Sequence, residues 1–264
     1  MSSLTLKCIA LVSMLLDHIG YCTSNTVLRC IGRLAFPLYV FLLVEGFRHT
    51  SSRGRYLARL TVFAVLSELP FMLLIWFYRL PWRGLSTLVR LTELPWTSSV
   101  LVTLILALLC LWAYETLSKD RVLRWFSLLP ALAVCLLYTV KIGGQPILHS
   151  DYDASGVLLA FVFYWLTDKP VPLLAGSFAA LFYSQLLLWA GELPGLLSGE
   201  LAALTPMKRW TMIELFALCA LPFIQSYNGR PGWRPKSKTA AKLLQLSFYA
   251  FYPLHFTVLY FIFS

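Results

Sequence analysis

The chain has 264 residues, of which 59% are hydrophobic and only 13% are charged, and its formal net charge is +10. Soluble domains usually carry about 25% charged residues, and disordered chains are poorer in apolar residues, so this composition excludes both classes. It indicates a membrane protein instead.

Apolar stretches long enough to cross a bilayer recur along the chain, with short polar breaks between them. A transmembrane helix needs about 20 mainly apolar residues. We therefore predict an all-α, polytopic helical bundle that forms a single domain over residues 1–264. The nine predicted spans are 4–21, 31–48, 56–78, 98–115, 124–141, 154–168, 171–190, 210–227 and 243–262.

Basic residues concentrate in alternate loops between these spans. Loops rich in Lys and Arg resist translocation and stay in the cytoplasm. The richer side holds Lys7, Arg48, Arg53, Arg55, Arg59, Lys119, Arg121, Arg124, Lys169, Arg230, Arg234, Lys236, Lys238 and Lys242. This asymmetry predicts a cytoplasmic N-terminus and an outer C-terminus, and it explains the positive charge without a nucleic-acid partner.

Other local patterns have structural interpretations. No small-residue cleavage site follows Leu4–Leu16, so we expect the first span to be retained. Residues 79–96, with a Trp at either end, are typical of an interfacial segment. The six cysteines lack metal-ligand spacing, so no metal site is predicted, and Cys22 and Cys30 either form a bridge or stay free.

Ionisable residues recur at similar depth in the outer half of five predicted elements. Inside a span such a residue costs a few kcal/mol on insertion scales, so it needs a partner, water or a function. The residues are Asp17, His18, Arg33, Glu68, Asp151 and His255. Their convergence is typical of a buried reaction centre, in which a His base is oriented by a second group, and also of a proton relay.

Asp17 and His18 are neighbours, so their side chains lie about 100° apart on a helix. Asp17 is therefore poorly placed to orient His18, and we expect a partner from another helix. The candidates are His255, Asp151 and Glu68. Helix breakers support a cavity near these residues, because proline frees backbone carbonyls and bends helices. They are Pro37, Pro70, Pro222 and Pro253.

A second polar group lies at the predicted cytoplasmic ends of the spans. Its members are Glu45, Arg48, His49, Arg53, Tyr227 and Asn228. Anchoring of the helix ends explains most of these residues. Glu45 lies three residues before Arg48 on one helix face, however, so the pair can present a fixed guanidinium to phosphate. We predict that this group binds an anionic cytosolic cosubstrate.

Several of these residues fall in a series of motifs. In chain order they are LKCIALVSMLLDHIG, LRCIGRLAFPLYVFLLVEGFRHT, RYLARLTVFAVLSELPF, SDYDASGVLLAFVFYW, SYNGRPG and FYAFYPLHF. With these motifs the chain resembles the TraX family of conjugal-transfer pilin acetylation proteins, which is similar in turn to the integral-membrane acyltransferase superfamily. One difference precedes the fourth span: the family pattern has an Asn-containing motif and this chain has WTSSVLVT, so a polar role there would fall on Ser98, Ser99 or Thr103.

The resemblance implies an acetyltransferase of the bacterial cytoplasmic membrane that uses acetyl-CoA as cosubstrate. The implied acceptor is the N-terminal amine of a pilin-like protein or a hydroxyl of a surface glycan, on the outer side. Membrane lipid is the other partner, and the oligomeric state is left open, with a homodimer as one option.

We hypothesise that acetyl-CoA enters from the cytoplasm with its phosphates against Arg48. His18 then acts as general base, and Arg33 stabilises the oxyanion. Asp17, Asp151 or Glu68 would orient the base. Direct transfer and an acetyl-histidine intermediate are both open.

The main alternative is a proton-coupled transporter or flippase that uses the same ionisable residues as a relay. Transporters commonly contain internal repeats, and neither DHIG nor VEGFRHT recurs in this chain. A non-catalytic assembly partner is the third interpretation, but it would leave the two polar groups without a shared purpose.

Overall fold

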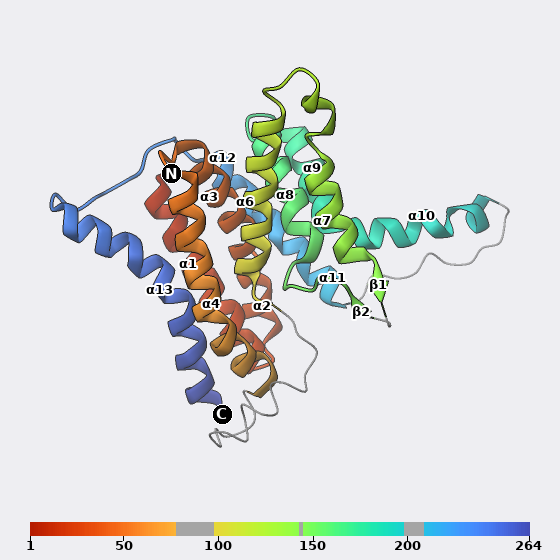
Figure 1. Ribbon diagram of the computed structural model, residues 1–264. Helices are drawn as coiled ribbons and strands as arrows, with labels where there is room; N and C mark the ends of the chain where they lie inside the picture. Colours follow the sequence, from red (N-terminus) through yellow and green to blue (C-terminus); the bar gives the residue numbers. More distant parts are fainter. Residues whose placement is uncertain (78–97, 143–144, 198–208) are drawn as a thin grey trace.

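The computed structural model describes residues 1–77, 98–142, 145–197 and 209–264, and in these it is almost entirely helical (Figure 1). The first half contains α1 Ser3–Cys22, α2 Thr26–Gly32, α3 Ala35–His49, α4 Arg53–Phe77, α6 Val100–Leu117, the 3-10 turn η1 Leu123–Phe126 and α7 Leu129–Thr139. The second half contains β1 Lys141–Ile142, β2 Gln145–Pro146, α8 Asp153–Leu166, α9 Pro170–Leu181, α10 Tyr183–Leu197, α11 Arg209–Glu214, the 3-10 turn η2 Leu215–Ala220, α12 Leu221–Gln225 and α13 Lys238–Phe263. The two strands form only a minimal antiparallel hairpin.

Several of these helices are long and apolar enough to cross a membrane. Five spans qualify among the described residues when α2 and α3 are taken together as one helical segment, Thr26–His49. The number is six when α9 and α10, which meet at a 76° bend, also count as one broken span. The chain is thus a multi-pass membrane protein. Three further apolar segments are shorter, among them α8, so the predicted count of nine spans stays a prediction. The predicted interfacial segment 79–96 lies outside the described residues.

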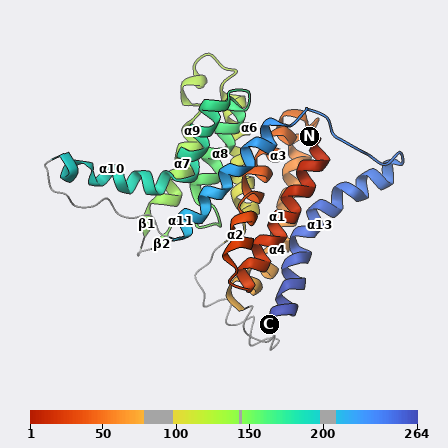
Figure 2. The ribbon, with the colours of Figure 1, turned by 180° about the vertical axis from the view of Figure 1, so that it is seen from behind.

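The connections alternate between the two ends of the bundle. The N-terminus lies at one end, called here the inner end, together with the turns that follow α3, α6, α8 and α12 (Figure 1). The C-terminus lies at the opposite, outer end in both Figure 1 and the reverse view of Figure 2. The inner end therefore carries the loops for which we predicted a cytoplasmic position.

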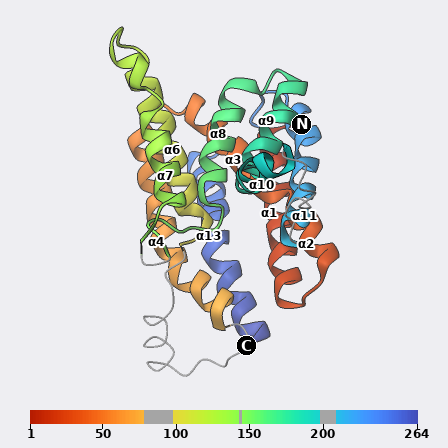
Figure 3. The ribbon, with the colours of Figure 1, turned by 90° about the vertical axis from the view of Figure 1, so that its right-hand side faces the viewer.

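The third helix, α3, forms the centre of the bundle. It is apolar on all sides, and its residues from Ala35 to Val44 are mostly buried, as expected for a helix surrounded by others. Figure 3 shows α4, α6 and α7 on one side of it and α1, α2 and α11 on the other. α13 packs along α4 and α1, while α10 projects away from the bundle (Figure 1).

A tight hairpin joins α1 to α2 at the outer end. The side chain of Asn25 caps α2 by accepting hydrogen bonds from the backbone N–H groups of Val27 at 3.0 Å and Leu28 at 3.2 Å. The two helices approach closely because Gly20 faces Leu28 and Gly32 faces Asp17. The hairpin thus brings the end of α1 against one face of α2, which positions the polar residues of both helices.

The helices also show where the four prolines lie and whether the cysteines are bridged. Pro70 and Pro253 lie inside α4 and α13. Pro37 and Pro222 stand in the first turns of α3 and α12, directly after interruptions of the longer helical segments Thr26–His49 and Thr211–Gln225, as expected for helix breakers. All six cysteines are free, so Cys22 and Cys30 do not form a bridge.

Candidate active site

Asp17 lies at the centre of a buried ion-pair network between α1 and α2. Its carboxylate accepts hydrogen bonds from Arg29 Nη1 at 2.5 Å and from Arg33 Nε at 3.2 Å, and a further bond from Arg33 Nη2. Arg29 and Arg33 are four residues apart, so both face α1 from the same side of the hairpin. Asp17 and Arg33 are each only 7% exposed, so these charges are held by one another rather than by water.

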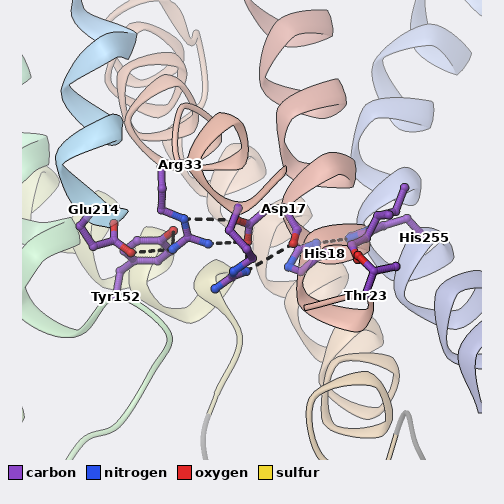
Figure 4. Close-up of polar contacts among 9 residues, drawn as sticks. Asp17, His18, Thr23, Arg33, Tyr152, Glu214 and His255 are labelled. Carbon is purple, nitrogen blue, oxygen red and sulfur yellow. Dashed lines mark hydrogen bonds and ion pairs between the residues drawn. The ribbon is translucent and has the colours of Figure 1, made fainter. Parts of the chain in front are cut away.

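Arg33 extends this network to two other elements. Its Nη1 atom donates to Glu214 Oε1 of α11 at 2.6 Å and to the hydroxyl oxygen of Tyr152 at 3.1 Å (Figure 4). The positive charges of Arg29 and Arg33 are thus balanced by the carboxylates of Asp17 and Glu214. Since the Tyr152 oxygen accepts from the guanidinium, its own O–H remains available as a hydrogen-bond donor.

His18 points away from this network, about 100° around α1 from Asp17, and pairs with His255 of α13. Figure 4 shows the two imidazoles facing each other, with His18 Nδ1 3.0 Å from His255 Nε2. His255 Nδ1 lies 3.0 Å from the backbone carbonyl oxygen of Phe251, and its ring stacks on that of Phe251. His255 was one of the three partners considered for His18, and it comes from another helix as expected.

The Phe251 carbonyl determines how protons are arranged in this pair. A carbonyl oxygen only accepts, so His255 Nδ1 carries a proton, and a neutral His255 then has a lone pair on Nε2. That lone pair accepts the Nδ1–H of His18. The remaining nitrogen of His18, Nε2, is consequently unprotonated in the neutral pair and has the lone pair of a general base.

A small internal cavity, here the histidine cavity, lies beside this base. It has a volume of about 40 Å³ and is lined by residues that include Met14, Asp17, His18, Asp151, Tyr152 and Tyr252. His255 is not among the lining residues and is only 4% exposed, so it lies behind His18. His18 is thus the member of the pair that meets the cavity.

A larger hollow, here the acidic recess, adjoins the histidine cavity. Its volume is about 250 Å³, and its lining includes Arg33, Asp151, Tyr152, Asp153 and Glu214. Asp151 and Tyr152 line both hollows, so they form the boundary between them. Three carboxylates against one arginine give the recess an excess of negative charge.

Asp151 is positioned by a backbone bridge to the start of α6. Its N–H donates to the Ser98 carbonyl oxygen at 3.1 Å, and the Ser98 N–H donates to His149 O at 3.1 Å. The carboxyl group is exposed to the recess yet enclosed by protein, and this desolvation raises its pKa to about 6, against the opposing effect of the Arg33 cation. Asp151 therefore keeps its proton to a higher pH than an ordinary aspartate.

Glu68 is bound to the polar residues that precede α6. Its Oε1 atom accepts from the Ser99 hydroxyl at 2.8 Å and from the Ser99 N–H at 3.1 Å. A carboxylate at a helix N-terminus is stabilised by the unpaired N–H groups there. Glu68 thus fixes the start of α6 next to Val100, which lines the histidine cavity. Thr103, the other polar residue considered there, hydrogen-bonds Ser150 at 2.6 Å.

The inner polar group lies at the other end of the bundle. Glu45 and Arg48 form the expected pair at 3.0 Å, and Arg48 also donates to the Tyr164 carbonyl oxygen at 2.6 Å. Arg53 forms an ion pair with Glu115. The remaining predicted members lie close by: His49 Nδ1 is 2.9 Å from the Glu45 carbonyl oxygen, Tyr227 packs edge-on against Phe41, and the Asn228 side chain accepts from Arg230 N–H at 3.1 Å.

The structure thus gathers Asp17, His18, Arg33, Asp151 and His255 at one site, with Glu68 beside it. None of the carboxylates proposed to orient His18 is hydrogen-bonded to it within the described part of the chain. Sequence reasoning missed Arg29 and Glu214. Glu214 carries the signal used for Glu68, an acidic residue inside an apolar segment, and Arg29 lies four residues before Arg33.

The contact between Gly32 and Asp17 gives a testable prediction. A Cβ atom on Gly32 would overlap the Asp17 side chain, so Gly32→Ala must push α2 away from α1. Overpacking of this kind costs about 1–3 kcal/mol, and we expect a lower midpoint of thermal unfolding in detergent. Gly54→Ala is the matched control, because a Cβ atom there meets nothing within 4 Å. Equal midpoints for the two variants would contradict the close contact.

Comparisons with known proteins agree with one another over nearly the whole chain. The model of a family described as TraX protein matches residues 2–263. The chain is 28% identical to the probable fimbrial assembly protein FimC, serogroup H1, of Dichelobacter nodosus, with 98% of this chain and 94% of that protein covered. No solved structure matches the chain.

Proposed function

This chain belongs to the TraX protein family, and from that premise we propose that it is a membrane-embedded acyltransferase. In this proposal it moves an acetyl group from cytosolic acetyl-CoA to an amine or hydroxyl at the outer side of the cytoplasmic membrane of a bacterium. The observation that carries the proposal is the paired His18, which lines a cavity inside an apolar bundle and whose Nε2 atom is unprotonated in the neutral pair. Buried ionisable groups of this kind mark functional sites in membrane proteins.

The residues around the histidine cavity supply the parts that acyl transfer needs. An ammonium acceptor first releases one proton to water, because a protonated amine has no lone pair. The acceptor nitrogen then attacks the thioester carbonyl carbon as His18 Nε2 takes the next proton, and a C–N bond forms. The C–S bond then breaks, and the thiolate of CoA leaves with the proton from His18. The Tyr152 hydroxyl, polarised by Arg33, donates to the oxyanion that develops between these steps.

The acidic recess favours an amine as acceptor. An N-terminal ammonium group would be attracted by the excess negative charge of Asp151, Asp153 and Glu214. A pilin-like N-terminus fits this chemistry, and the fimbrial assembly name of the relative from Dichelobacter nodosus supports the same class of acceptor. A glycan hydroxyl would use the same base without this attraction.

The proposal is tested with purified protein in lipid nanodiscs and acetyl-labelled acetyl-CoA. We expect label to reach a peptide with a free N-terminus and not the same peptide with a blocked one. Release of CoA before any acceptor is added would indicate an acetyl-histidine intermediate. No transfer by folded protein to peptides or sugars, combined with proton-driven flux in proteoliposomes, would support the transporter alternative instead.

The pH dependence of transfer to the peptide amine is expected to depend on Asp151. Its carboxyl group attracts an ammonium only when ionised, so kcat/KM should fall as the pH drops through about 6, the pKa of this group. The charged groups around it are Arg33, Asp17, Glu214 and Arg29. Asp151→Asn should lower kcat/KM for the amine and remove this acidic limb. With a hydroxyl acceptor the variant should change little, and an equal loss for both acceptors would contradict the role.

A further inference from the structure

A second large hollow, here the cationic cavity, opens at the inner end between α1 and α13. Its volume is about 420 Å³, and its lining includes Lys7, Trp233, Arg234, Lys238 and Lys242. No carboxylate lines it in the described part of the chain. Figures 1 and 2 show α13 diverging from α1 toward this end, with the segment before α13 crossing between them.

That crossing segment is held in place by the N-terminus. The backbone N–H of Ser3 donates to the Arg230 carbonyl oxygen at 2.9 Å, and that of Leu4 donates to Pro231 O at 3.2 Å. Gly232 adopts a left-handed conformation with φ of +85°, and a side chain there would meet Ser2. These contacts fix Trp233 and Arg234 as one wall of the cationic cavity.

The cations of this cavity differ from those of the inner polar group. Arg48 and Arg53 are each paired with a carboxylate. Lys7, Lys238 and Lys242 form no ion pair with a carboxylate of the described residues. Uncompensated cations around one hollow are the arrangement that binds a multiply charged anion, because each charge acts on the ligand rather than on a neighbour.

An apolar cavity lies between the cationic cavity and the histidine cavity and shares lining residues with both. It has a volume of about 140 Å³ and is walled mainly by apolar and aromatic side chains, such as Leu43, Leu60 and Leu104. It shares Lys7, Gln245 and Phe248 with the cationic cavity. At its other end it shares Tyr39, Val100 and Tyr252 with the histidine cavity. The three hollows therefore follow one another through the bundle.

Both flanking helices give similar lengths for this series. Along α1, Lys7 and His18 are separated by roughly 16 Å at 1.5 Å per residue, and along α13, Lys242 and His255 are separated by roughly 20 Å. A ligand that fills the series has an anionic head, a long and weakly polar arm, and its reactive group at the far end.

We propose that the cationic cavity binds the phosphates of the thioester cosubstrate and that the apolar cavity holds its pantetheine arm, which delivers the thioester to His18. This inference rests on the proposed function and differs from the sequence-based prediction in the position of the phosphates. The donor then enters between α1 and α13, and the acceptor enters through the acidic recess on the opposite side of the histidine cavity.

The test is equilibrium binding of CoA to the full chain in nanodiscs, with Lys238→Ala/Lys242→Ala as the variant. Charge-assisted contacts to phosphate are lost, so we expect CoA affinity to fall about tenfold or more. Affinity for S-acetylpantetheine, which lacks the nucleotide phosphates of CoA, should stay unchanged. Lys238→Arg/Lys242→Arg keeps the charge and should bind CoA as wild type does. Both lysines are exposed, so folding is unaffected.

Lys236→Ala is the matched control, because this exposed lysine of the same segment does not line the cavity. Wild-type CoA affinity in the double variant, or a loss confined to Arg48→Ala, would overturn the proposal. Binding that depends on the cavity without acetyl transfer to any acceptor would support this site and refute the proposed function. Acetyl transfer by the double variant with an unchanged KM for acetyl-CoA would support the proposed function and refute this site.

Discussion

His18→Ala is expected to lower the rate of acetyl transfer about 10²- to 10⁴-fold, the usual contribution of a positioned general base. The imidazole is the group that meets the histidine cavity, and His255, the imidazole that the variant retains, is not among the residues that line the cavity. The measurement is kcat with saturating acetyl-CoA and peptide acceptor. CoA affinity should be unchanged, since the phosphates are proposed to bind at the inner end.

His255 is a positioning residue in this scheme, and its replacement separates two explanations of the His18 result. His255→Ala removes the acceptor for His18 Nδ1–H, so the base loses its fixed tautomer and kcat should fall. His255→Gln can place an amide oxygen near the former Nε2 atom and should restore much of the rate. If His255 only packed against its neighbours, kcat of the two variants would differ no more than their stabilities explain.

Undiminished turnover in His18→Ala would refute the base assignment, and equal thermal unfolding midpoints for the variant and wild type would exclude misfolding as the cause of a loss. If instead His18→Ala abolished proton-coupled flux in proteoliposomes while no variant affected acetylation, the relay interpretation would be favoured. Both outcomes concern the same pair of imidazoles, so the two assays must be run on the same preparations.

The helical framework was predictable because its signals are local. The predicted spans 4–21 and 56–78 correspond within a few residues to α1 and α4, since apolar composition and flanking charges mark both ends. The break between α2 and α3 lies just before Pro37, one of the prolines predicted to bend a span. The contacts of Arg29 and Arg33 with Asp17 were not predicted, because no hydropathy window registers a tertiary contact.

The sequence predicted which residues belong to the candidate site better than it predicted which of them contact one another. Ionisable residues in apolar segments are conspicuous, which identified Asp17, His18 and His255 from the sequence. Their partners depend on helix rotation, which periodicity within such uniformly apolar helices leaves undetermined. Glu68 accepts from the Ser99 N–H before α6, and Glu214 accepts from Arg33. From the sequence alone, either carboxylate could have been assigned to either partner.

Asp17→Asn is expected to destabilise the fold by about 3–5 kcal/mol, because it leaves a buried arginine without its counter-charge. The carboxylate bonds both Arg29 and Arg33, whose side chains are only 14% and 8% exposed. The measurement is thermal or denaturant unfolding in detergent. Asp168→Asn is the matched control, since this exposed carboxylate forms no ion pair with any described residue.

A second substitution distinguishes charge imbalance from simple loss of hydrogen bonds. The network contains two cations, Arg29 and Arg33, and two anions, Asp17 and Glu214. Asp17→Asn leaves one positive charge in excess, whereas Asp17→Asn/Arg29→Gln restores neutrality and keeps the Arg33–Glu214 pair. The double variant should therefore lose clearly less stability than the sum of the two single variants, by an interaction energy of about 1–3 kcal/mol. Additive losses would mean that the arginines reach water or lipid headgroups when Asp17 is gone, and that the network is not the closed, charge-balanced unit that holds α1 and α2 beside His18.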